Sequence, residues 1–436
     1  MTGVNEVEEL SVDALRWMRG TARDTGGGGL GWPVRPSDDD VDPMLYNGTA
    51  GIVPVLLEAW RHFGDDAYAD TALRAARSLA DAVDEHSDDS LYFGLTGIAL
   101  VLRAVHRELG DSAADAAADR ALARVRSRFD GTRWGDLFEL MGGNAGIGLG
   151  VLLCGDAESA IGALEPYVRT AEPTAAGVTW EWRSDRESRL HHISHGSLGI
   201  AYALAAVGAD TGRADLVELA RAGVAEVVSR DEAGPEGFLV PHSDPPHRPD
   251  IVQRHSYGWC HGPAGDAQVF RLLRDVLGEP SWAELADRCW HTVTRSGLPQ
   301  RLRPGFWDNN GRCCGTAGVL ALACDRIAER GDSPDSADSR DFARILVADL
   351  ASHATRDAEG ARWSNVAHRP APGDLEPETG WAMGNAGIVR ELLRYLRLSK
   401  GGDRRYAFTW PDQPAVRLAA TQATEPIRPA GIDVAS

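Results

Sequence analysis

The chain has 436 residues, of which 43% are hydrophobic and 25% charged, a composition typical of soluble globular proteins. Its formal net charge of −19 argues against binding to nucleic acid or to an anionic membrane surface, both of which favour basic proteins. No apolar run approaches the about 18 residues of a membrane helix, and the first ten residues lack the features of a signal peptide. We therefore expect a cytoplasmic protein with no membrane insertion, whose six cysteines are reduced.

A pair of glycines separated by two residues recurs seven times, each time before an apolar segment. The first glycines of these turns are Gly48, Gly94, Gly143, Gly196, Gly262, Gly315 and Gly384. Between the turns lie amphipathic segments with helical spacing, among them 6–19, 66–86, 111–129, 214–230 and 281–293. Each repeat is thus predicted to consist of an outer amphipathic helix, a loop, a glycine turn and a more apolar inner helix.

Seven helix pairs of this kind cannot bury their apolar faces alone and must pack on one another. An open solenoid needs polar capping repeats, whereas both terminal repeats here keep the apolar inner helix. The pattern therefore favours an all-α fold, an α,α-toroid of seven helix pairs whose glycine turns meet at one pole and line a funnel. We expect residues 1–400 to form this single domain. Residues 401–436, with seven prolines or glycines and no sustained period, are expected to form a loosely packed tail.

Three cysteines lie just ahead of two of these turns: Cys260 before Gly262, and the adjacent Cys313 and Cys314 before Gly315. Thiolates are ligands that Zn²⁺ prefers, and three protein ligands leave a fourth tetrahedral position for water or substrate. The spacing matches no zinc-finger pattern, and free cysteines are also common as small buried residues. On spacing alone the three cysteines indicate either a catalytic zinc site or core packing. The remaining cysteines fall in apolar helical runs and are assigned to packing: Cys154, Cys289 and Cys324.

Three motifs, WCHG at 259–262, CCG at 313–315 and ISHGSLG at 193–199, resemble those of the LanC family, the lanthionine synthetase cyclases and their LanC-like relatives. The resemblance covers residues from about 45 to 398 and implies an α,α-toroid with one catalytic zinc. Its ligands here would be Cys260, Cys313 and Cys314, the last standing where many members have histidine. The implied reaction adds a cysteine thiol to a dehydroalanine or dehydrobutyrine in a precursor peptide, forming a lanthionine or methyllanthionine thioether ring.

The resemblance also implies residues for proton transfer. His195 matches the family's catalytic histidine, and an imidazole suits either protonation or deprotonation near neutral pH. Many members carry an aspartate four residues before the third turn. Glu139 holds that position here and Asp136 lies one helical turn earlier, so either residue is a candidate.

Several residues near these motifs are candidates for substrate contact. A family arginine ahead of the W-C motif is replaced by serine here, with Arg254 close by. His261 is expected to be an exposed turn residue that touches substrate. Trp180 and Trp182, in the loop before His195, are expected either to stack on a peptide or to cap the pole. Two further histidines are expected to lie at the surface or to line the substrate: His191 and His192.

We expect a dehydrated precursor peptide as the partner. The chain has no kinase-type glycine-rich motif and almost no lysine, so dehydration would require a separate dehydratase. One alternative is the addition of glutathione to dehydroamino acids in proteins, which would require arginines in the pocket. Another is a non-catalytic toroid whose zinc is structural and whose funnel only binds peptide. A helical glycosidase is disfavoured, because the turns offer cysteine and histidine in place of two facing carboxylates.

Overall fold

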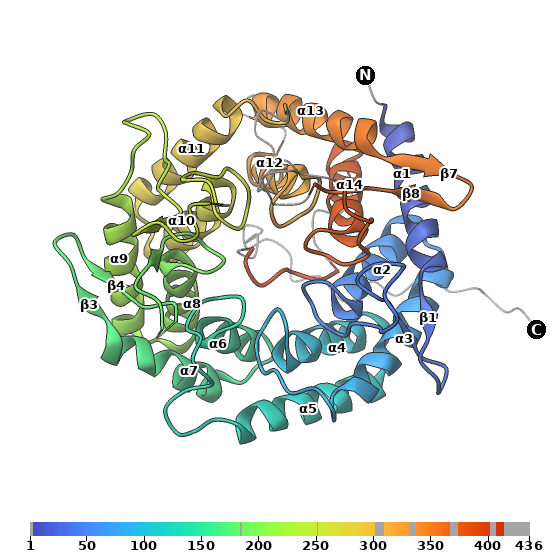
Figure 1. Ribbon diagram of the computed structural model, residues 1–436, viewed down its shortest axis with the longest axis horizontal. Helices are drawn as coiled ribbons and strands as arrows, with labels where there is room; N and C mark the ends of the chain where they lie inside the picture. The colour runs from blue at the N-terminus through green and yellow to red at the C-terminus, as the bar shows by residue number, and fades with distance from the viewer. Residues whose placement is uncertain are drawn as a thin grey trace, which may run out of the picture.

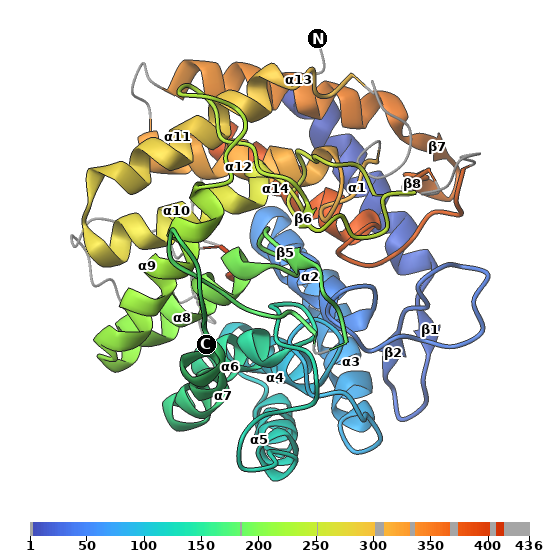
Figure 2. The ribbon, with the colours of Figure 1, turned by 60° about the vertical axis from the view of Figure 1, so that its left-hand side comes forward.

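Fourteen α-helices form a closed ring in the part of the chain that the computed structural model describes, seen end-on in Figure 1. The described residues are 3–183, 185–250, 252–300, 309–331, 336–366, 374–401 and 407–413. Figure 2 shows the same ring turned by 60°, with α5, α11 and α13 at its outer edge. No helix within these ranges is both long and apolar enough to span a membrane.

Seven helices form the inner layer, and each begins directly after the first glycine of a turn. They are α2 (Thr49–Phe63), α4 (Leu95–Leu109), α6 (Asn144–Leu153), α8 (Ser197–Thr211), α10 (Pro263–Leu277), α12 (Thr316–Arg330) and α14 (Asn385–Ser399). Each inner helix packs on the next, and α14 packs on α2. The contacts therefore close the ring, which confirms the predicted α,α-toroid.

Seven amphipathic helices form the outer layer. They are α1 (Val4–Gly20), α3 (Asp66–Ala82), α5 (Ser112–Ser127), α7 (Ala157–Thr170), α9 (Ala214–Val228), α11 (Pro280–Arg295) and α13 (Ala337–His353). The repeat was predicted to place each outer helix before its inner partner, but α3 to α13 pack mainly on the inner helix that precedes them. Short connections cause this order: a left-handed glycine such as Gly64 or Gly110 ends the inner helix, and the outer helix starts within two residues. The first helix, α1, packs on the last inner helix, α14, and so completes the outer layer where the two ends of the helical ring meet.

Four two-stranded antiparallel sheets lie in the connecting loops. They pair β1 (Arg23–Asp24) with β2 (Leu30–Gly31), β3 (Glu172–Pro173) with β4 (Val178–Thr179), β5 (Arg189–Leu190) with β6 (Ser243–Asp244), and β7 (Thr355–Asp357) with β8 (Gly360–Arg362). The β5–β6 pair matters most for function, because it draws together the two loops that enter the fourth and fifth glycine turns.

The second glycine of each turn is required by close packing of the backbone. A Cβ atom on Gly265 would lie 1.9 Å from the carbonyl oxygen of Trp259, and one on Gly318 would lie 2.4 Å from that of Arg312. Only glycine lets the chain fold back so tightly against its own helix. The two turns that carry the cysteines are thereby held in one conformation.

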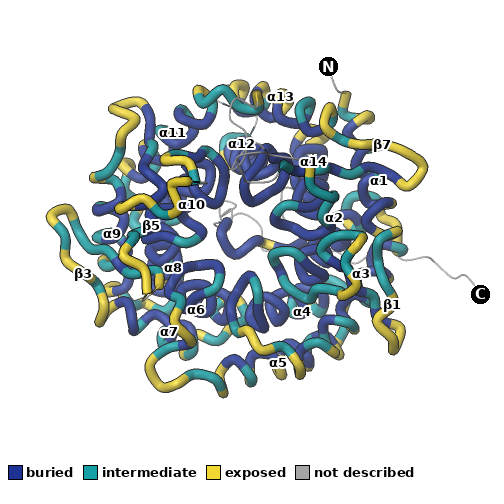
Figure 3. The backbone as a smooth tube through the Cα atoms, in the orientation of Figure 1, coloured by how far each residue is buried: buried dark blue, intermediate teal, exposed yellow. Residues whose placement is uncertain are grey.

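Residues 407–413 lie in the middle of the ring rather than on its surface (Figures 1 and 3). Ala407, Phe408, Trp410 and Asp412 are each at most 1% exposed. The expectation of a loosely packed tail is therefore not met by these residues, because the ring encloses a space that they fill. The remainder of the predicted tail, 402–406 and 414–436, lies outside the described residues.

Candidate active site

The backbones of adjacent turns are hydrogen-bonded to one another around the glycine-turn pole. The residue two positions before the first glycine of a turn donates its N–H to the carbonyl of the equivalent residue in a neighbouring turn. Six such bonds, of 2.8 to 3.3 Å, run from Tyr46 to Tyr92, Tyr92 to Met141, Ser194 to Cys260, Cys260 to Cys313, Cys313 to Ala382 and Ala382 to Tyr46. Cys260 and Cys313 occupy equivalent positions in adjacent repeats, which is why they meet despite their distance in the sequence.

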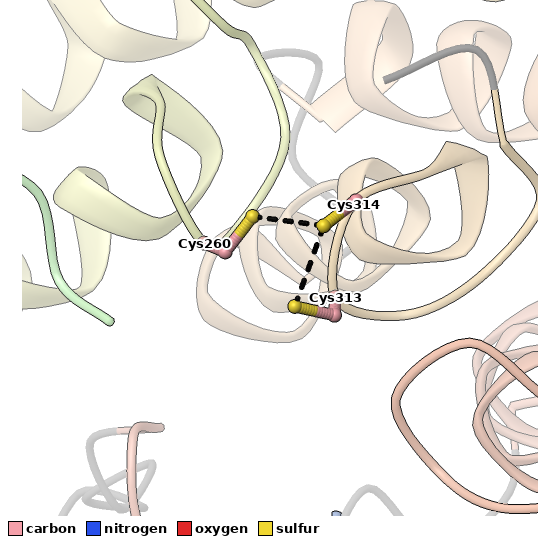
Figure 4. A group of neighbouring side chains, drawn as sticks. All are labelled: Cys260, Cys313 and Cys314. Atoms are coloured by element: carbon pink, nitrogen blue, oxygen red, sulfur yellow. Dashed lines mark hydrogen bonds between the residues drawn. The ribbon is translucent and has the colours of Figure 1, made fainter. Parts of the chain in front are cut away.

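The three predicted metal ligands converge at this pole, as Figure 4 shows. The Sγ atom of Cys314 lies 3.1 Å from that of Cys260 and 3.6 Å from that of Cys313. All three cysteines are free thiols, buried, with their sulfur atoms within 4.8 Å of one another. Among the described residues this is the one group of histidine, cysteine and acidic side chains close enough to hold a metal ion.

The protonation of the cluster indicates what it can hold. Hydrogen bonds from the thiols of Cys260 and Cys314 lower the pKa of Cys313 well below its ordinary value, while burial raises the pKa of Cys260 well above it. The hydroxyl of Tyr46 also donates to Cys313 Sγ, at 3.3 Å. The cluster alone thus favours a single thiolate, and three buried thiolates would require a cation. A tight set of three soft donors fits Zn²⁺.

On the neighbouring side of the pole, Glu139 faces His195. An oxygen of the Glu139 carboxylate, Oε2, lies 3.1 Å from His195 Nδ1. The same carboxylate accepts the N–H groups of Met141 at 2.5 Å and Gly142 at 2.8 Å. If the pattern of backbone bonds continued here, the N–H of Met141 would donate to the carbonyl of Ser194 in the fourth turn. The side chain of Glu139 accepts this N–H instead. The result is a buried carboxylate aimed at an imidazole.

This contact shifts the acidity of His195. Burial alone would lower the pKa of His195, but the charge of Glu139 and the hydrogen bond to it outweigh burial and raise the pKa above its ordinary value. The side chain of His195 is 34% exposed, so it is accessible from solvent. By contrast, the carboxylate of Asp136 is 72% exposed and pairs with Arg133. Of the two acidic candidates, only Glu139 contacts His195.

His261 stacks on His195, with ring centroids 5.6 Å apart. It is only 8% exposed, so the expectation of an exposed turn residue was wrong. A third ring, that of His242 just before β6, packs edge-on with His261, with centroids 4.2 Å apart. Burial lowers the pKa of His242 to about 3 and that of His261 well below its ordinary value. These two imidazoles are therefore neutral at physiological pH and surround His195 with uncharged rings.

His191 and His192 are buried, contrary to the expectation of a surface or substrate-lining position. His192 Nδ1 lies 2.7 Å from Asp266 Oδ2, and both side chains are fully buried. His191 Nδ1 lies 2.7 Å from the carbonyl oxygen of Pro241. The pairing of β5 with β6 brings the second loop over both histidines, and no local sequence pattern announces that pairing.

The three remaining candidates for substrate contact are Trp180, Arg254 and Trp182. Trp180 is 2% exposed, donates its Nε1–H to the carbonyl of Tyr167 and covers Gly223. It is a core residue, and of the two roles expected for it, stacking on a peptide does not fit this burial. Arg254 is exposed and pairs with Glu232 rather than turning toward the cysteines. Trp182 is half-buried.

Trp182 packs its ring against the edge of His247, with centroids 5.7 Å apart, and therefore lies in the histidine-rich loops over the pole.

Sequence reasoning missed two residues that support the cysteines directly. Tyr46 holds the position before Gly48 that Cys260 holds before Gly262, and this equivalence is the signal that could have identified it. Arg312, next to Cys313, is buried with its guanidinium 5.6 Å from the ring centroid of Trp259 and 5.5 Å from that of Trp381. Both contacts stiffen the turns that hold the thiols.

Comparison with known proteins agrees with this architecture. The sequence matches the family model of lanthionine synthetase C-like protein over residues 39–248 and 247–339. The fold is similar to that of nisin cyclase, with a TM-score of 0.60 and 14% identity over 91% of this chain and 99% of that chain. It is also similar to an α-1,6-mannanase of Salegentibacter sp. HEL1_6, with a TM-score of 0.52 and 12% identity over 90% of this chain and 99% of that chain. Comparison with curated proteins gives no match.

At such low identities the two structural similarities establish the fold alone. The family model, however, covers more than half of the chain, including both cysteine-bearing turns and the turn that carries His195. The protein therefore belongs to the lanthionine synthetase C-like family.

Proposed function

We propose that this protein is a zinc-dependent cyclase that adds a cysteine thiol to a dehydroalanine or dehydrobutyrine of a precursor peptide, forming a thioether ring. The observation that carries the proposal is the convergence of three buried thiols at the pole where Glu139 faces a partly exposed His195. Membership of the lanthionine synthetase C-like family supports it. Cys260, Cys313 and Cys314 would hold the metal.

The donor set leaves room for one further ligand, as in catalytic zinc sites. When bound there, Zn²⁺ would supply deprotonation of a coordinating substrate thiol at neutral pH. Because three thiolate donors pass more charge to the metal than a mixed cysteine and histidine set, this site favours a more nucleophilic incoming thiolate. The hydroxyl of Tyr46, at 3.3 Å from Cys313 Sγ, would moderate that charge by sharing one of the thiolates.

The chain itself would move the protons. The addition forms a carbon–sulfur bond and breaks the π bond of the alkene, while the thiol loses one proton and the α-carbon gains one. Its product is therefore an isomer of the substrate. With Nδ1 held by Glu139, His195 has Nε2 to take up the thiol proton or to return one to the α-carbon. The charge of Glu139 stabilises the imidazolium between these two events.

The proposed substrate is a peptide already dehydrated by a separate enzyme, and the proposed place of action is the cytoplasm. Trp182 and His247, which contact one another in the loops over the pole, are the aromatic surface that we assign to peptide contact. This assignment replaces Trp180, which is fully enclosed by the fold.

The test is thioether formation by the zinc-loaded full chain on a dehydrated peptide with one cysteine. Cyclisation leaves the mass unchanged, so the readout is the loss of a thiol that reacts with an alkylating reagent. We expect the wild type and Cys154→Ala to consume the thiol and Cys313→Ala to leave it, since Cys154 lies outside the site.

Parallel reactions with glutathione and a dehydrated protein without cysteine separate the alternatives. Consumption of glutathione alone would reject the cyclase in favour of glutathione addition. If the zinc-loaded wild type leaves both thiols unchanged, the protein is a binding toroid and not a catalyst.

A further inference from the structure

Residues 407–413 cross the interior of the ring, where Figure 3 shows them surrounded by the inner helices and, apart from the exposed Thr409, buried. One end of this segment is fixed by polar contacts. The N–H of Ala407 donates to Glu58 Oε1 at 2.8 Å, and the side chain of Arg107 donates to the carbonyl of Ala407 at 2.8 Å. Glu58 and Arg107 lie in the C-terminal halves of α2 and α4, which point away from the glycine turns. The segment therefore starts from the pole opposite the candidate site.

Two residues of the segment, Phe408 and Gln413, are fixed to α14. The side chain of Arg390 donates to the carbonyl of Phe408 at 3.4 Å and to Gln413 Oε1 at 3.1 Å. Arg390 also pairs with Glu391 at 2.6 Å, and both of these side chains are fully buried. A stretch that is held by buried charged groups on α2 and α14 is an integral part of the core, although it comes after the last helix of the ring.

The other end of the segment reaches the glycine-turn pole from beneath. Trp410 stacks on Trp381, with centroids 4.4 Å apart and ring planes at 14°. The carboxylate of Asp412 accepts the hydroxyl of Tyr92 at 2.9 Å and lies 3.8 Å from the guanidinium of Arg312. Each of these partners belongs to a glycine turn or its entering residues, and Arg312 is bonded to Cys313 in the chain.

Trp381 and Arg312 connect the segment to both cysteine-bearing turns. The ring of Trp381 lies edge-on to that of Trp259, 5.5 Å between centroids, and Trp259 directly precedes Cys260. The guanidinium of Arg312 lies over both indole rings. The next residue after Trp381, Ala382, accepts the N–H of Cys313 at 2.8 Å. The indoles and Arg312 thus form one layer between the segment and the thiols.

We propose that residues 407–413 are an internal support that positions the three thiols of the candidate metal site from the opposite side of the ring. The inference rests on the proposed function only in so far as those thiols bind zinc. Trp410 and Asp412 are positioning residues: neither touches the thiols, and each acts through Trp381, Tyr92 or Arg312. Loss of the support would let the Cys260 and Cys313 turns move relative to one another.

The test uses the full chain and two readouts. The first is the rate at which each cysteine of the metal-free protein reacts with a thiol reagent, mapped by mass spectrometry. The second is zinc affinity by competition with a chelator. We expect Trp410→Ala to speed the labelling of the three site cysteines about tenfold by local opening and to weaken zinc binding about tenfold, as the loss of an outer partner does. Trp410→Phe keeps an aromatic stack and is expected to restore both values.

Two controls separate positioning from general loss of stability. Labelling of Cys289 and Cys324, which are buried away from the site, is expected to stay at the wild-type rate. Arg126→Ala removes an exposed ion pair with Asp156 in the outer layer, away from the segment, and is expected to behave as the wild type. Should Trp410→Ala fail to fold, Asp412→Asn keeps the side-chain shape and is expected to change both readouts in the same direction by less.

The inference would be overturned if Trp410→Ala and Asp412→Asn both showed the labelling rates and the zinc affinity of the wild type. It would also be overturned if the labelling of Cys289 became faster to the same extent as that of the site cysteines. A wild type that binds no zinc, with faster labelling in Trp410→Ala, would instead reject the proposed function and leave the support in place.

Discussion

The two arcs of the glycine-turn pole are built on the same repeat but differ in how their backbones are joined. On the thiol side, the bonds from Ser194 through Cys260 and Cys313 to Ala382 form an unbroken series. On the acid–base side, the N–H of Met141 donates to the side chain of Glu139 instead. The continuous arc fixes the backbone of the turns that carry the three cysteines. The interrupted arc places the buried carboxylate of Glu139 next to His195, whose imidazole can ionise. The fold thus places the three thiols and the pair of Glu139 and His195 on separate arcs of one ring of turns.

The largest expected effect comes from removing His195, to which we assign proton transfer. His195→Ala should lower the rate of thioether formation by about 100- to 10,000-fold, the usual contribution of a general acid–base group. Zinc content should stay at the wild-type level, because the imidazole is outside the thiol cluster. Single-turnover kinetics and elemental analysis on the same sample check both parts. Loss of zinc in this variant would break the separation of the two arcs.

The second glycine of a turn is expected to tolerate no added atoms in either arc, since a Cβ on Gly146 or on Gly265 would lie 1.9 Å from a carbonyl oxygen. In Gly265→Ala the new Cβ would lie 1.9 Å from the carbonyl of Trp259 and 2.6 Å from Cγ2 of Ile193, so the turn must shift. We expect the free energy of unfolding to fall by about 3 kcal/mol, at the upper end of overpacking costs. Chemical denaturation measures the change.

Gly162→Ala, in the outer helix α7, provides the matched control. No atom lies within 4 Å of the Cβ position there, and the residue is helical. Alanine should stabilise this helix by up to about 1 kcal/mol relative to glycine. Equal destabilisation of both variants would contradict the importance of the close backbone approach.

Neutralising the carboxylate is expected to act on His195 through its charge. In Glu139→Gln the attraction of the carboxylate for the imidazolium is lost while burial remains, so the pKa of His195 should fall. The neutral form of His195 would then persist to lower pH, and the acidic limb of the pH–rate profile would move in the same direction. A histidine-selective NMR titration of the metal-free protein follows the shift. An unchanged pKa would show that the contact at 3.1 Å does not govern this residue.

The smallest expected effect is the loss of one hydrogen bond to the thiols. Tyr46→Phe removes the hydroxyl that donates to Cys313 Sγ and keeps the ring that packs on Phe93. Zinc affinity should fall by about tenfold, as for other outer partners of metal ligands, with little change in thermal stability. Chelator competition measures the affinity. The equivalent change at Tyr68, which lies in the outer helix α3 and packs on Phe63, should leave zinc affinity at the wild-type level.

Much of the fold and part of the site could be predicted from the sequence, because both follow the repeat. The seven glycine turns fix the inner helices, and the position directly before the first glycine is held by His195, His261 and Cys314 in three successive turns. Residues at one position of a toroidal repeat meet at the pole, so these assignments needed only the correct register.

Features that depend on contacts between loops could not be predicted in this way. The composition of 401–436 resembles a tail, yet 407–413 is buried, because the ring encloses a space that the sequence does not show. Trp180 lies in a loop like Trp182, but it fills a gap between α7 and α9 that only tertiary packing creates. The burial of His192 follows from its pairing with Asp266 across two turns.

Whether the thiols on the continuous arc bind zinc is decided by the metal content of the purified protein. Elemental analysis of the wild type, Cys313→Ala and the control Cys154→Ala, each expressed with zinc present, should give one zinc per chain in the wild type and the control. It should give sharply less in Cys313→Ala. A folded wild-type protein that carries no zinc under these conditions would contradict the account.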